Sequence, residues 1–154
     1  MKPVLQALLV ADHVYEDKAT SKKVVAGIFH AMYFARREVE QQVDLKGGKV
    51  KIEIPPGGMK AGSPFSYISL TDIIGKQEFD LRYVRLRDDK TIFEAHFQID
   101  CSDPLATVEV MLPLPPLPAN QPGIYALELL WNQEPLGSYR IAVRELKERE
   151  TEDE

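Results

Sequence analysis

Two pairs of adjacent residues carry the side chains best suited to catalysis. Asp12 and His13 stand near the start of the 154-residue chain, and Asp100 and Cys101 stand much later. A thiol becomes a strong nucleophile when a base such as histidine removes its proton, and a carboxylate can orient that base. Such a site requires the fold to bring the two pairs together, and nothing in the sequence demands that. An enzyme with an unfamiliar site is therefore an alternative rather than the leading hypothesis.

The motifs of the common enzyme classes are absent. The chain has no Gly-x-Ser-x-Gly, no His-Glu-x-x-His, no P-loop and no Gly-x-Gly-x-x-Gly that opens a helix after a strand. Its three histidines, His13, His30 and His96, each stand alone in their segments, although His96 shares its parity with Glu94. A lone histidine on a strand is more often a hydrogen-bonded surface group than a ligand. We therefore expect a protein that is not an enzyme, with no metal site and no cofactor.

Aspartates at the turns raise the alternative of a calcium site of the kind found in C2-type sandwiches. Asp72, Asp88 and Asp100 follow or join apolar segments. Calcium needs six to eight oxygen ligands, while each of these turns supplies at most two carboxylates. Successive turns of an antiparallel sheet also fall at opposite ends, so we expect no calcium site.

The composition is that of an ordinary globular chain, with 44% apolar and 28% charged residues. The single cysteine excludes an intramolecular disulfide. Lys2 precedes an apolar run, but that run ends after Ala11, is broken by Gln6 and lacks a convincing cleavage site for a signal peptide. No stretch of about 18 apolar residues is present, so we expect no transmembrane helix. The simplest organisation is one domain over residues 1–144, followed by an acidic tail over residues 145–154.

Charge is distributed unevenly along the chain. The tail has six acidic and two basic residues, whereas residues 18–60 have nine basic and four acidic residues. The basic residues are scattered and no aromatic-basic RNA motif accompanies them, so we expect neither nucleic acid nor membrane as a partner. Lys46, Lys49 and Lys51 form a basic group within residues 18–60 and are candidate contacts for a protein partner.

Short apolar segments with period-two alternation dominate the chain and are separated by Gly, Pro and Asp. Such segments are typical of β-strands. They occur as "VLQALLVADHVY", "VVAGIFHAMYF", "KVKIEI", "FSYISLTD", "QEFDLRYVRL", "TIFEAHFQI", "TVEVMLPL" and the two strands of residues 122–143. "RDDK" predicts a hairpin connection. Residues 35–45 fit either a short helix or a polar strand extension. We therefore predict an all-β antiparallel β-sandwich of about eight or nine strands, immunoglobulin-like or C2-like, with at most one short helix.

The proline-rich segment over residues 112–123 has two interpretations. Its Pro-x-x-Pro spacing could present a polyproline ligand to an SH3-like groove. No Lys or Arg flanks it closely, and proline runs commonly form stiff crossovers between sheets. We favour a crossover.

Residues 122–143 raise the question of whether Trp131 belongs to a binding surface or to the core. Tyr125, Leu127 and Leu129 share its parity, so we expect Trp131 to close one end of the sandwich. The alternate row, which includes Leu130, is then predicted to face outward. Leu130 is accordingly a candidate partner contact.

The stretch "PGIYALELLWNQEPLGSYRIAV" resembles the last two strands of immunoglobulin-like bacterial modules. Together with "LLVADHVYEDKATSKKVVAGIF", "YISLTD" and "FDLRYVRLRDD", it resembles an uncharacterised bacterial family of small β-sandwich proteins, a domain of unknown function. The chain departs from that family at residues 35–63, which are longer than expected. The resemblance implies a cytoplasmic bacterial sandwich without an assigned active site.

The leading hypothesis is a non-enzymatic β-sandwich that binds a protein partner or forms a homo-oligomer. Its expected contact surfaces are the basic group and the strand edge near "KVKIEI". A small-ligand or carbohydrate-binding sandwich is the alternative, and it predicts an open groove that exposes Trp131, Tyr67 and Tyr139.

Overall fold

The computed structural model describes the chain over residues 2–34, 37–42, 49–54 and 63–146. These residues form β-strands and connections with no helix, so none of them belongs to a helix able to span a membrane. The strands are β1 (Val4–Glu16), β2 (Lys23–Ile28), β3 (Ala31–Phe34), β4 (Arg37–Gln42), β5 (Lys49–Ile54), β6 (Phe65–Thr71), β7 (Gly75–Arg85), β8 (Lys90–Cys101), β9 (Val108–Pro113), β10 (Gly123–Trp131) and β11 (Glu134–Glu145).

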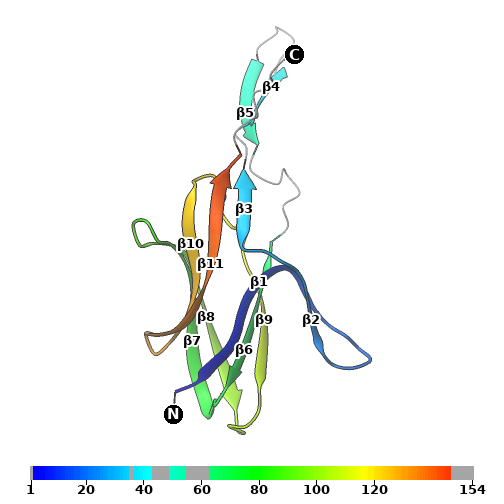
Figure 1. Cartoon of the computed structure of the whole chain (residues 1–154), viewed down its shortest axis with the longest axis vertical. Coiled ribbons are helices and arrows are strands. Elements are labelled where there is room, and N and C mark those ends of the chain that lie inside the picture. Colours follow the sequence, from blue (N-terminus) through cyan, green and yellow to red (C-terminus); the bar gives the residue numbers. More distant parts are fainter. Residues whose placement is uncertain (1, 35–36, 43–48, 55–62, 147–154) are drawn as a thin grey trace.

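Nine of these strands form two sheets, as the alternating pattern predicts. One sheet has four strands in the order β2-β1-β6-β9, and the other has five in the order β3-β11-β10-β7-β8 (Figure 1). β4 and β5 pair with each other as a separate hairpin. β4 confirms the strand extension, rather than the short helix, for its part of residues 35–45. The pairing is antiparallel throughout these sheets except between β3 and β11, which run parallel.

Side chains from both sheets meet in a common core. Val10, Ile68 and Leu70 enter it from the four-stranded sheet, and Leu81 and Leu127 enter it from the five-stranded sheet, all with 0% exposure. Along the strands that carry these residues, the core side chains are mostly every second one, because successive side chains of a strand point to opposite faces. The period-two pattern of the sequence is therefore the pattern of core burial.

The chain passes between the two sheets from β2 to β3, from β6 to β7, from β8 to β9 and from β9 to β10. "VVAGIFHAMYF" was expected to form one strand, but β2 lies in the four-stranded sheet and β3 in the five-stranded sheet. Gly27 supplies a positive φ of 75° near the end of β2, which other residues rarely adopt. The proline-rich segment joins β9 to β10 across the sheets, so the predicted crossover is confirmed.

β10 has buried side chains on both faces. Trp131 is half-buried and packs against the core, as expected for a residue that closes one end of the sandwich. Its indole Nε1 donates a 2.9 Å hydrogen bond to Oε1 of Gln77. Leu130, however, is only 3% exposed. The prediction that Leu130 faces solvent is wrong, because β10 is an inner strand whose neighbours β7 and β11 cover its outer apolar side chains.

The pairing of β7 with β8 positions the side chains considered below. It is regular from Gly75 opposite Cys101 to Tyr83 opposite Phe93, and then shifts by one residue before Val84. On the core side, Phe79 stacks on Phe97 and Tyr83 stacks on Phe93, each with ring centroids 5.3 Å apart. The aromatic pairs thus fix which residues of β8 face the core.

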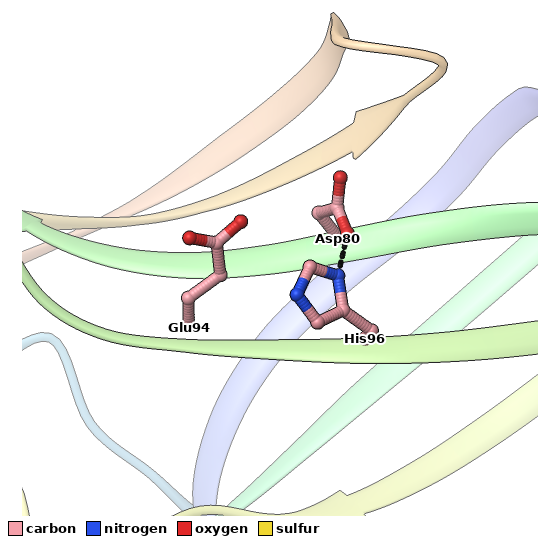
Figure 2. A group of neighbouring side chains, drawn as sticks. All are labelled: Asp80, Glu94 and His96. Atoms are coloured by element: carbon pink, nitrogen blue, oxygen red, sulfur yellow. Dashed lines mark hydrogen bonds and ion pairs between the residues drawn. The ribbon is translucent and has the colours of Figure 1, made fainter.

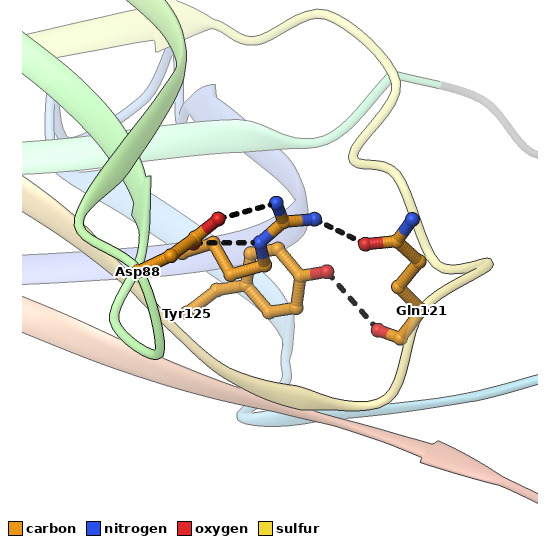
Figure 3. A network of polar contacts seen from close by, with 4 residues as sticks. Asp88, Gln121 and Tyr125 are labelled. Carbon is orange, nitrogen blue, oxygen red and sulfur yellow. Dashed lines mark hydrogen bonds and ion pairs between the residues drawn. The ribbon is translucent and has the colours of Figure 1, made fainter.

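A polar network holds the turn between β7 and β8 against the segment that precedes β10 (Figure 3). The Arg85 guanidinium donates to both carboxylate oxygens of Asp88, over 2.9 and 2.7 Å, and also to the side-chain oxygen of Gln121. The Tyr125 hydroxyl donates to the Gln121 carbonyl over 3.0 Å. Hydrogen bonds from Arg85 lower the pKa of Asp88 from its ordinary 3.8 to about 2.

We expect the Arg85–Asp88 contact to make stability depend on pH in the acid range. A carboxyl group with a lowered pKa in the folded state stabilises the protein above its unfolded pKa, and that contribution is lost as pH falls from about 4 to about 2. Urea unfolding across this range should show a smaller loss of unfolding free energy for Asp88→Asn than for the wild type. Equal losses in the two proteins would contradict the contact.

Candidate functional site

Charged side chains gather on the outer face of the five-stranded sheet, over β7 and β8. Because Phe79, Leu81 and Tyr83 point into the core, their neighbours in β7 point away from it. The register places Asp80 opposite His96 and Arg82 opposite Glu94. An Asp–His pair and a Glu–Arg pair therefore lie side by side across the two strands, and we call these four residues the outer charge cluster.

Figure 2 shows His96 of this cluster beside Asp80, with Glu94 nearby on the same strand as His96. Its Nδ1 contacts the Asp80 carboxylate, and its side chain is 74% exposed while that of Asp80 is 20% exposed. In Figure 2, the second ring nitrogen lies on the side of the ring that faces Glu94. A carboxylate on one imidazole nitrogen fixes the orientation of the ring and leaves the other nitrogen available to another group.

Arg82 connects the cluster to the middle of the sheet. It lies opposite Glu94 on one side and opposite Glu128 of β10 on the other. One of its terminal nitrogens is 3.6 Å from a Glu128 carboxylate oxygen. Its Nε is buried and has no hydrogen-bond partner among the described residues. Arg82 is thus a cation held between two acidic strand neighbours.

A solvent-open hollow of about 380 Å³ adjoins the cluster. Its lining residues are Glu78, Phe79, Asp80, His96, Phe97 and Gln98. This volume lies at the lower end of the range for small-molecule pockets, and all the polar lining residues except the half-buried Asp80 are exposed. The hollow thus offers no deep apolar cleft for a ligand.

Three members of the cluster have the donor atoms of a metal site. Asp80, Glu94 and His96 each offer one ligand atom, and these atoms lie within 4.8 Å of one another. An imidazole with two carboxylates suits a divalent transition metal such as zinc better than calcium, which takes oxygen ligands. The sequence did not indicate this group, because Asp80 lies on a different strand from Glu94 and His96.

The cluster also lies at the edge of its sheet. β8 pairs with β7 alone, so the backbone groups along its other side have no strand partner among the described residues. β8 has 12 residues and contains neither Pro nor Gly. An edge of this kind is a template for pairing with another strand.

The two residue pairs considered for catalysis lie in different sheets. His13 is in β1 opposite Ala26, whereas Cys101 ends β8 opposite Gly75. The Cys101 thiol donates to the Asp103 carbonyl over 3.2 Å. No hydrogen bond joins His13 to Cys101 within the described parts of the chain. The geometry gives the hypothesis of a thiol nucleophile no support.

The predicted basic contacts are Lys46, Lys49 and Lys51. Lys46 lies outside the described residues. Lys49 and Lys51 belong to β5, at register positions opposite Gln42 and Glu40. Their role in binding stays a prediction.

The aromatic residues proposed for ligand binding do not form an open platform. Trp131 and Tyr139 are half-buried and pack against the core, and the Tyr139 hydroxyl donates to the Phe29 carbonyl over 2.6 Å. Tyr67 is also half-buried, and its hydroxyl bonds to Glu109. These three residues belong to different strands and have separate partners.

The sequence did not predict that Asp80 and Arg82 belong to the candidate site. Glu94 and His96 share a parity, which placed them on one face of a strand, but no motif linked them to "DLR" in the preceding strand. The alternating core residues of β7 and β8 indicate how the two strands are aligned. Matching Phe79, Leu81 and Tyr83 to Phe97, Ala95 and Phe93 places Asp80 opposite His96.

No protein-family model matches the chain, and a search of curated proteins finds no similar sequence.

Proposed function

We propose that this protein is a non-enzymatic β-sandwich module that associates with a second copy of itself through the free edge of β8. The observation that carries this proposal is a long, regular edge strand beside exposed charges of both signs. Main-chain hydrogen bonds to an added strand supply affinity, and side chains on both faces supply specificity. A bacterial, cytoplasmic role, as in the β-sandwich family that the sequence resembles, is part of the same proposal.

β8 is better suited to pairing than the other outer strands. β3 has four residues, while β2 and β9 have six each. β2 contains Gly27 at positive φ, and β9 ends at Pro113 where the proline-rich segment begins. Short length, bulges and prolines protect an edge from pairing. β8 has a register shift only near its start and is regular from Phe93 to Cys101.

Self-association should therefore depend on concentration and protect β8. We expect light scattering to show a monomer converting to a dimer as concentration rises from micromolar to millimolar. Amide hydrogen exchange in β8 should be slower at the high concentration than at the low one. Exchange in β9 should be the same at both, and β9 serves as the control edge strand within the same molecule. A monomer at every concentration, or protection of β9 instead of β8, would defeat the proposal.

A second candidate function is the binding of a divalent transition-metal ion. The observation that favours it is the donor set of Asp80, Glu94 and His96, with ligand atoms within 4.8 Å of one another. Ligands on neighbouring strands are held in place by the backbone ladder, which reduces the entropy lost on binding. The Asp80 contact to one imidazole nitrogen resembles the carboxylate that supports many zinc-binding histidines.

Titration with Zn²⁺ tests this second candidate. We expect calorimetry to detect one site per chain, and His96→Ala to weaken binding at least about tenfold, because it removes the only imidazole of the set. His13→Ala is the matched control, since His13 is also exposed and follows an aspartate. Equal affinity in the two variants would exclude a site at His96.

A further inference from the structure

We infer that the second copy adds antiparallel along β8 with the two-fold axis at Ala95. This inference rests on the proposed self-association and names the register of the pair. It follows from residues 93–97, "FEAHF", which complement themselves when one strand is turned against another. Around Ala95, Glu94 comes to lie opposite the partner's His96, and Phe93 opposite the partner's Phe97.

On the outer face, this register extends the charge pairs of one chain into a continuous ladder. Within one chain, Asp80 lies opposite His96 and Arg82 opposite Glu94. Across the new strand pair, His96 meets the partner's Glu94, which itself lies opposite the partner's Arg82. Each row thus crosses four strands in the order Asp80, His96, the partner's Glu94 and the partner's Arg82, and the two-fold axis creates the same row in reverse.

The ladder gives His96 an acidic neighbour on each side. Its Nδ1 contacts Asp80 within the chain, and in Figure 2 its second ring nitrogen faces Glu94 of the same chain. In the proposed register, the partner's Glu94 lies opposite His96 across the edge of β8. Each acidic residue of the ladder is adjacent to a basic residue, and opposite charges directly across a sheet are stabilising.

On the core side, the same register extends the aromatic stacks. Phe97 stacks on Phe79 and Phe93 stacks on Tyr83 within one chain. The new pair places Phe97 beside the partner's Phe93, so an aromatic row runs from Phe79 of one copy to Tyr83 of the other. Both phenylalanines of β8 are half-buried in the single chain and become covered by association. Burial of apolar surface supplies the main favourable free energy.

Other registers lose this complementarity. Moving the axis one residue toward the start of β8 places Glu94 opposite the partner's Glu94. Moving it one residue toward the end places the two His96 rings opposite each other and puts Phe97 across from Ala95. Centring the axis between two residues places polar residues opposite aromatic ones, because a shift by one residue exchanges the faces of a strand. Among these neighbouring registers, the axis at Ala95 is the one that matches both faces.

A charge exchange between two variants tests the register. In a homodimer of Glu94→Arg, each new arginine lies opposite the partner's His96. In a homodimer of His96→Glu, each new glutamate lies opposite the partner's Glu94. The two-fold axis makes two such pairs in each homodimer. Each variant alone should dimerise about tenfold more weakly than the wild type, because both Glu94–His96 pairs are lost and like charges directly opposite each other across strands are destabilising. In a mixture, the arginine of the first variant meets the new glutamate of the second, and the heterodimer should prevail.

Native mass spectrometry of the mixture, in the presence of a metal chelator, measures the three dimers. Circular dichroism and thermal unfolding establish that each variant is folded. Heterodimer in excess of the statistical share supports the register. A statistical mixture, or homodimers as strong as those of the wild type, overturns it.

Cross-linking gives a second measurement that does not alter the charges. In a Cys101→Ser background, Ala95→Cys places one thiol from each copy at the axis, where a short thiol-specific cross-linker should join them. Gln98→Cys is the control, because the two residues 98 lie six positions apart along the paired strands, roughly 20 Å. A dimer that cross-links through residue 98 but not residue 95 overturns the register while leaving self-association standing. A monomer at all concentrations overturns both.

Discussion

The register between β7 and β8 is the constraint on which both faces of the five-stranded sheet depend. Its stacked pairs, Phe79 on Phe97 and Tyr83 on Phe93, hold β8 so that its odd-numbered residues from Phe93 to Cys101 face the core. The same pairing sends Asp80 and His96 to the outer face. A slip of one residue would bury the charges and expose the aromatic rings. The register between β7 and β8 therefore fixes both the core packing and the positions of the charged side chains.

The sequence predicted the fold class because burial follows strand parity. Alternating apolar residues indicated the strands, and the proline-rich segment indicated the crossover. The outer charge cluster was not predictable from spacing alone. Counted from the first pair of the hairpin, Arg85 with Lys90, a uniform ladder would place Asp80 opposite Ala95, and the register shift beside Val84 moves it to His96. The prediction that Leu130 is exposed was wrong for another reason, since its burial depends on the strands beside it and not only on its parity.

The side chains that could bind a ligand or a partner lie at an edge of the five-stranded sheet rather than in a cleft. Glu94, His96 and the backbone groups without a strand partner among the described residues lie along β8, and Asp80, the third possible metal ligand, lies on the neighbouring strand β7. The residues first considered for catalysis are divided between the two sheets. Strand addition uses the features of this edge together, because it pairs the backbone, extends the charge ladder and covers the aromatic rings of β8 in one step.

The central claim is that two copies meet along β8 around Ala95. Isotope-filtered nuclear Overhauser spectroscopy on a mixture of ¹³C-labelled and unlabelled protein tests it most directly, because it detects only protons that are close across an interface. The account predicts intermolecular contacts between the ring of Phe93 in one copy and the ring of Phe97 in the other, together with contacts between the two Ala95 residues. Intermolecular contacts confined to β2, β3 or β9 would contradict it.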